Sequence, residues 1–156
     1  MSESPQKPSG KKPSGNARAS AARLTAVQTI YQMAITGVDG AQGLRDYRDH
    51  LAEQEMEGDM YVPAETGLLS RIVLGVEERK ADIAGMIAAA FEGKTSANEP
   101  LLHAILACGA YELLVEPETD TALIIGEYLD ITHAFYEGSE NKLVNGILDR
   151  LAKELR

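Results

Sequence analysis

The 156-residue sequence has few aromatic residues, no tryptophan and a single cysteine. Strands favour aromatic and β-branched residues, whereas helices favour alanine and leucine, so this composition favours helices. Cys108 alone cannot form an internal disulfide or a cysteine-based zinc site, and its apolar surroundings predict a small buried side chain. Because the sequence also shows no bilayer-length apolar run and no signal-peptide pattern, we expect a cytoplasmic protein without a membrane partner.

Motifs that carry chemistry are lacking as well. The three histidines, His50, His103 and His133, are far apart in the sequence and match no metal-binding pattern. The sequence contains no glycine-rich phosphate loop after a strand, no nucleophile elbow and no activated cysteine. It therefore predicts no catalytic residue, no metal and no cofactor, and it favours a protein that is not an enzyme.

Charge is distributed unevenly along the chain. The net charge is −9, but residues 1–23 carry five basic residues and one acidic residue, so the rest sums to −13. Residues 1–16 consist largely of Ser, Pro, Gly and Lys without apolar periodicity, which predicts a disordered basic arm. Such an arm is either a solubilising tail or an electrostatic tether for phosphates.

Apolar residues repeat at helical spacing through the remaining sequence, which predicts an all-α domain over 17–156. We expect about seven helices in two packed halves, 17–93 and 98–156, joined by a Gly/Ser/Asn/Pro connector. The first helix is predicted over 17–35, the second over 44–54 and the third from 62–63 onward. Capping signals are Gly37 after the first helix and, before the last three, Ser96 or Asn98, Thr119 or Asp120, and Ser139.

Several short motifs are more specific than the general spacing of apolar residues in helices. They are Arg23, Ala26, Gln28 and Tyr31 in the first helix, GAYELL and IIGEYLDITHAF in the middle, and KLVNGILD near the end. Together they resemble the NusB family of bacterial transcription antitermination factors. The resemblance implies an all-helical factor that binds the boxA element of ribosomal RNA leaders together with the small-subunit ribosomal protein that serves as Nus factor E. The pair would join RNA polymerase, with other Nus factors, and suppress termination.

In this family, RNA contacts the arginine-rich start of the first helix and the beginning of the last helix. Here the arginine cluster is thinned, and Leu143 replaces a phenylalanine that can stack on a base, a contact that contributes ~1–3 kcal/mol. Leu143 is either a weaker RNA contact or a core residue. Carried over to this sequence, the RNA-binding candidates are Lys11, Lys12, Arg18, Ser20, Arg23, Gln28, Ser139, Lys142 and Leu143.

The family's protein interface maps onto Tyr31, Leu101 and Leu102. Tyr31 lies on the apolar face of its helix, so it is either an interface residue or a packed core tyrosine. Glu112 stands in an apolar helix, where a buried and hydrogen-bonded structural role is favoured over an exposed one.

Two other functions fit parts of this pattern. The lost basic residues and Leu143 favour a NusB-like protein-interaction module with weak or no RNA binding. A related helical domain also occurs at the N-terminus of some ribosomal RNA cytosine methyltransferases, but the sequence does not continue into a catalytic domain, which disfavours that reading. The oligomeric state, monomer or homodimer, is left open by the sequence.

Overall fold

The computed structural model describes residues 15–56, 62–91 and 99–156, and these residues form seven helices without a strand. The all-α prediction is therefore confirmed. Most of the basic arm, including Lys11 and Lys12, and the capping candidates Ser96 and Asn98 lie outside the described residues. The helices are α1 (Gly15–Thr36), α2 (Gly40–Met56), α3 (Thr66–Glu78), α4 (Lys80–Phe91), α5 (Pro100–Val115), α6 (Thr121–Phe135) and α7 (Glu140–Leu155).

α5 is the central helix of the fold. Its residues from Ala104 to Leu113 are all buried, and α5 contacts α1, α3, α4, α6 and α7. A helix that is apolar on every side has to be surrounded by other helices, which is the position that α5 occupies. Cys108 is fully buried in this helix, as predicted, and burial raises the pKa of its thiol.

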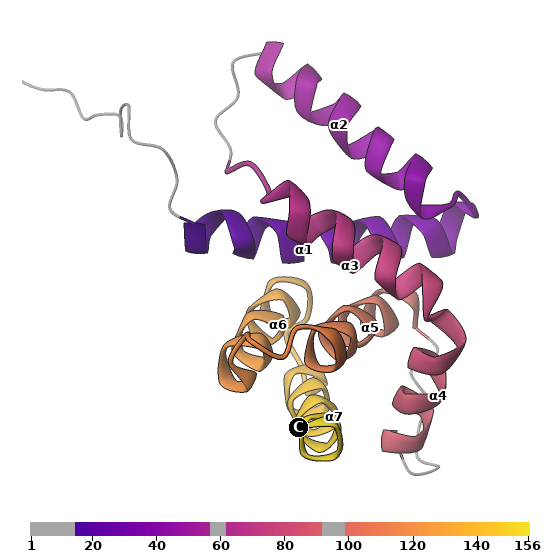
Figure 1. Ribbon diagram of the computed structural model, residues 1–156, viewed down its shortest axis with the longest axis vertical. Helices are drawn as coiled ribbons and strands as arrows, with labels where there is room; N and C mark the ends of the chain where they lie inside the picture. The colour runs from indigo at the N-terminus through magenta and orange to yellow at the C-terminus, as the bar shows by residue number, and fades with distance from the viewer. Residues whose placement is uncertain (1–14, 57–61, 92–98) are drawn as a thin grey trace, which may run out of the picture.

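The other helices are arranged around α5 in two groups (Figure 1). α1 runs across one end of the α5–α6–α7 bundle, and α2 lies on the side of α1 and α3 that faces away from the bundle. α4 belongs to the N-terminal half of the sequence, yet it contacts α5 and α7. One hydrophobic cluster contains residues from all seven helices, so the two sequence halves share a core.

Two predicted helix starts differ from the structure. α2 begins at Gly40 instead of Leu44, because its glycines allow close contacts: a Cβ on Gly40 would lie 2.7 Å from Glu77 Oε1. α3 begins at Thr66 instead of residues 62–63, because the Glu65 carboxylate accepts hydrogen bonds from the first free N–H groups of the helix.

Capping side chains also differ in part from the prediction. Gly37 has a φ of +82° directly after α1, as expected for a glycine C-cap. Asp120 accepts a hydrogen bond from Leu123 N–H and caps α6, and Glu99 caps α5. Ser139 occupies the N-cap position of α7 but makes no side-chain capping hydrogen bond, which corrects its predicted capping role.

Candidate nucleic-acid interface

A buried ionic cluster joins the start of α1 to α5 and α6. Arg23 Nε donates to Glu112 Oε2 at 2.7 Å, and Arg23 Nη2 donates to Glu112 Oε1 at 3.0 Å. Tyr128 Oη donates to Glu112 Oε2 at 2.6 Å. Glu112 and Tyr128 are 0% exposed and Arg23 is 5% exposed. The bidentate pair with a third hydrogen bond provides the partners that a buried charge requires.

The ionic cluster determines the protonation of its members. Burial alone would lower the pKa of Arg23, but the hydrogen bonds and charge of Glu112 outweigh burial and raise it. Burial, together with the Glu112 charge, raises the pKa of the Tyr128 phenol, so Tyr128 stays a neutral donor. The structural role expected for Glu112 is confirmed. Arg23, in contrast, is enclosed by carboxylates, and this geometry supports a positioning role instead of the direct phosphate contact that the sequence predicts.

α6 holds the starts of both helices that were predicted to bind RNA. Ser20 Oγ donates to Glu127 Oε1 at 2.6 Å, and Arg23 Nη1 donates to the same oxygen at 3.1 Å. Asn141 Nδ2, in the first turn of α7, donates to the Leu129 carbonyl at 3.0 Å. The two α6 anchors are two residues apart, which is about 3 Å along a helix axis. The second turn of α1 and the first turn of α7 are therefore attached to neighbouring positions of α6, on different sides of it, because residues two apart on a helix point about 200° apart.

Arg18 is the RNA-binding candidate whose side chain retains hydrogen-bonding capacity. Its carbonyl accepts a hydrogen bond from Glu65 N–H at 3.0 Å, which attaches the start of α1 to the start of α3. Its Nε atom is buried and has no hydrogen-bond partner. An unsatisfied guanidinium N–H is costly in the free protein, and because the Arg18 Nε atom is inaccessible to solvent, an anion would satisfy it only after the side chain moves.

Gln28 is directed to another side of α1. It is exposed and lines a polar hollow of about 300 Å³ between α1 and α2, together with Thr25, Asp46 and His50. α2 lies on the side of α1 away from the bundle, so the structure does not bring Gln28 together with the candidates on α7 (Figure 1).

The start of α7 is open to solvent. Ser139 and Lys142 are exposed, and the Leu143 side chain is 36% exposed. The core interpretation of Leu143 is therefore not supported, because Val144 and Ile147 provide the buried face of this helix. Lys142 has no partner among the described residues, which leaves its ammonium group available to a ligand.

The predicted protein-interface residues gather at the other end of α1. Tyr31 is 38% exposed, which rules out a fully packed core tyrosine. Tyr136, just after α6, donates a hydrogen bond to Glu99, the N-cap of α5. Burial first and then the Glu99 contact raise the pKa of Tyr136, and Tyr31 and Glu140 add to this increase. The end of α6 and the start of α5 are thus in contact through Tyr136 and Glu99.

Leu101 and Leu102 follow Glu99 directly but differ in exposure. Leu101 is half-buried, whereas Leu102 is 8% exposed and belongs to the core. Of the two, Leu101 is positioned to contact a partner. Tyr31 is thirteen residues from Arg18, or about 20 Å along α1, so the α1 start and the Tyr31 surface lie at opposite ends of this helix.

Comparison with known proteins assigns this arrangement to a family. The NusB family pattern matches residues 20–153. The chain belongs to the NusB family. NusB-family relatives named transcription antitermination protein NusB occur in Rhizobium rhizogenes, at 37% identity covering 87% of this chain and 86% of the relative. Another NusB relative, from Rhodopseudomonas palustris, is 35% identical to this chain, and the match covers 96% of this chain and 90% of the relative.

The solved structure of T. maritima NusB has the same fold, with a TM-score of 0.74, 24% identity and coverage of 92% of this chain and 94% of that chain. NusB-family membership gives this chain a general role in transcription antitermination. The NusB family consists of transcription factors and not of enzymes, which agrees with the sequence-based expectation. Among residues 15–56, 62–91 and 99–156, no group of three His, Cys, Asp or Glu residues could hold a metal ion. No helix in the same ranges is long and apolar enough to cross a membrane.

Sequence reasoning missed Glu127 and Glu99 on this NusB-family surface, and it considered Tyr136 only as a possible substitute for the base-stacking phenylalanine. Glu127 binds both Ser20 and Arg23, and Glu99 and Tyr136 bind each other. The sequence does contain a signal for the Glu127 contact. Arg23 precedes Ala26, Val27 and Ile30 by three, four and seven residues, which places Arg23 on the buried face of α1. A buried arginine requires carboxylate partners. No comparable signal identifies the Glu99–Tyr136 contact, because it joins two helix ends 37 residues apart.

Proposed function

We propose that this chain binds the boxA element of ribosomal RNA leaders together with the small-subunit ribosomal protein that serves as Nus factor E. Acting within a complex of Nus factors, it would promote processive transcription of ribosomal RNA operons. The observation that carries the proposal is the common anchoring of the α1 and α7 starts on α6. α6 thereby links two segments that are about 120 residues apart in sequence, and one RNA strand would cross α6 to contact both.

The RNA contacts that we propose are Arg18 and Lys142, with Ser139 and Leu143 beside Lys142. Arg18 contributes an unsatisfied guanidinium N–H and Lys142 a free ammonium group, both suited to phosphates. Ser20 and Arg23 position the α1 start through Glu127 and Glu112. Lys11 and Lys12 remain proposed tethers, and Gln28 would reach RNA only if the strand also crossed the hollow between α1 and α2.

Arg18→Gln and Lys142→Gln should each weaken boxA binding and reduce its salt dependence. For single-stranded RNA, each lost phosphate contact lowers the slope of log K against log salt by about 0.7. Fluorescence anisotropy of labelled boxA RNA at four salt concentrations, with and without the ribosomal protein, measures this slope.

Lys153→Gln is the matched control, because Lys153 is on the last turn of α7, about 16 Å along the helix from Lys142. The Lys153 ammonium group pairs with Asp149 at 3.2 Å, and the Lys153 side chain is 77% exposed. An unchanged slope for Arg18→Gln and Lys142→Gln would contradict these phosphate contacts.

For the protein partner, we propose the surface formed by Tyr31, Leu101 and Tyr136. Exposed tyrosines at a partner surface often dominate the binding energy. Tyr31→Ala should weaken binding of the ribosomal protein about tenfold or more, as measured by calorimetry. Leu74→Ala is the control, because Leu74 is 43% exposed on α3 next to α2. Equal effects of both substitutions would argue against the Tyr31 surface.

The runner-up is a protein-interaction module with weak or no RNA binding. The enclosure of Arg23 and the engagement of Ser20 by Glu127 favour it, because both remove donors from the α1 start. In that case the ribosomal protein would bind with Tyr31-dependent affinity, while boxA RNA would show no saturable binding at low salt with or without the partner.

A further inference from the structure

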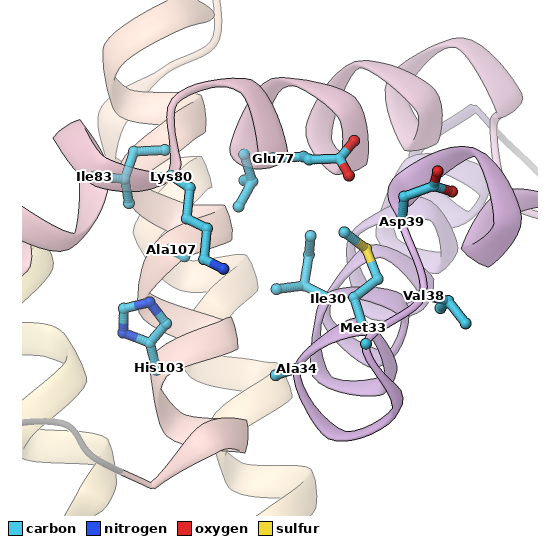
Figure 2. A pocket seen from close by; sticks show the side chains of 12 residues that line it. Ile30, Met33, Ala34, Val38, Asp39, Glu77, Lys80, Ile83, His103 and Ala107 are labelled. Carbon is cyan, nitrogen blue, oxygen red and sulfur yellow. The ribbon is translucent and has the colours of Figure 1, made fainter.

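A pocket lies between the end of α1, the junction of α3 and α4, and the first half of α5 (Figure 2). Its volume is about 330 Å³, at the lower end of the range of small-molecule sites. Most of its wall is aliphatic or thioether side chain: Ile30, Met33, Ala34, Val38, Val76, Ile83 and Ala107. The pocket is separate from the α1 and α7 starts, and none of the RNA-binding candidates lines it.

Two basic side chains face this apolar wall. Figure 2 shows Lys80 extending from the start of α4 toward the His103 ring of α5, with Ile30 and Met33 across the opening. Burial and the Lys80 charge lower the pKa of His103, which agrees with a short distance between the two groups. Within the described residues, neither Lys80 nor His103 has a hydrogen-bond or ion-pair partner.

The two carboxylates of the pocket are already engaged at the start of α2. Glu77 Oε2 accepts a hydrogen bond from Gly40 N–H at 2.9 Å, and Asp39 Oδ1 accepts one from Gln42 N–H at 2.9 Å. The N-terminus of a helix carries a partial positive charge that offsets a carboxylate beside it. Among the charged groups that line this pocket, Lys80 is therefore the one without a hydrogen-bond or ion-pair partner in the described residues.

We propose that this pocket binds a small monoanionic carboxylate with an aliphatic or aromatic body. The body would fill the apolar wall, and the carboxylate would accept hydrogen bonds from Lys80 Nζ and His103. At about 30 Å³ for each non-hydrogen atom, the pocket holds roughly ten such atoms. The proposal does not depend on RNA binding, since it concerns other residues and another face.

Octanoate is a suitable probe, because it has about this size and one negative charge; octanol is its neutral counterpart. Chemical-shift mapping by NMR at pH 7.5 should place octanoate at the amides of Met33, Ala34 and His103. From the affinity that ligands of this size reach, we expect a Kd on the order of 0.1 to 1 mM. Perturbed amides confined to other surfaces, or no saturable octanoate binding, would overturn the proposal.

The variant Lys80→Met keeps the aliphatic stem and removes the charge. It should weaken octanoate binding about fivefold and leave octanol binding unchanged, because only the carboxylate uses the ammonium. Lys153→Met, on the last turn of α7, is the matched control and should leave both unchanged. Ala34→Leu, at an exposed position of the pocket wall, should weaken both ligands. Equal octanoate affinities for Lys80→Met and Lys153→Met would refute the proposed carboxylate site.

Discussion

Replacement of Glu112 by alanine is expected to destabilise the protein by about 3–5 kcal/mol. The substitution leaves the buried Arg23 guanidinium without its bidentate partner and removes the acceptor of the Tyr128 hydroxyl. Glu127 would remain as a partner of Arg23 Nη1 at 3.1 Å, but the rest of a guanidinium that is 5% exposed could not be hydrated without opening the contact between α1 and α5. Urea denaturation followed by circular dichroism measures the loss.

Two further variants separate this effect from a general loss of charge. Glu116→Ala removes a carboxylate that pairs at 3.0 Å with Arg71, whose side chain is 53% exposed, and should cost about 1 kcal/mol or less. The double variant Arg23→Met/Glu112→Leu, which replaces the pair by apolar side chains, should recover most of the stability. If Glu112→Ala and Glu116→Ala cost the same, the buried pair is not the structural link between α1 and α5.

Gly75→Ala and Gly85→Ala should change stability in opposite directions. Gly75 is on α3, and a Cβ there would lie 2.2 Å from Tyr111 Cε1, so the buried ring of Tyr111 would have to move. Overpacking of this kind costs about 1–3 kcal/mol. Gly85 is exposed on α4 with no atom within 4 Å of an added Cβ, so alanine should stabilise by about 0.5–1 kcal/mol through helix propensity.

Thermal unfolding of the two glycine variants tests the close approach of α3 and α5. Adding Tyr111→Leu to Gly75→Ala should reduce the penalty of the glycine substitution, because the clash is with the far end of the tyrosine ring. A Gly75→Ala protein as stable as Gly85→Ala would mean that the ring of Tyr111 is not held in place by its neighbours.

The helices could be predicted from the sequence because their information is local. The spacing of apolar residues identified all seven, and the capping signal at Thr119 or Asp120 identified the start of α6. The start of α2 was misjudged because Gly40 and Gly43 are poor helix formers in isolation, whereas in the fold they allow α2 to approach Glu77 and Thr29. Tertiary contacts of this kind have no signal within a short window of sequence.

The candidate surface was predictable in its position and less so in its chemistry. The two helix starts could be chosen from their similarity to a known family, but only the structure separated the exposed Lys142 and the unpaired Arg18 Nε from the enclosed Arg23. Gln28 was predicted to bind RNA together with Arg18, which is on the same helix. Only the packing of the helices shows that Gln28 points toward α2. The pocket at Lys80 could not be foreseen, because three separate segments form it.

The hydrogen bonds between Arg23 and Glu112 join residues 89 positions apart in the sequence. During synthesis at about 5–20 residues per second, roughly 4–18 s pass between incorporation of the arginine and of its carboxylate partner. α1 can pack on α2 and α3 before that, because both precede α5 in the sequence. The ionic lock between Arg23 and Glu112, by contrast, can close only after α5 has been made.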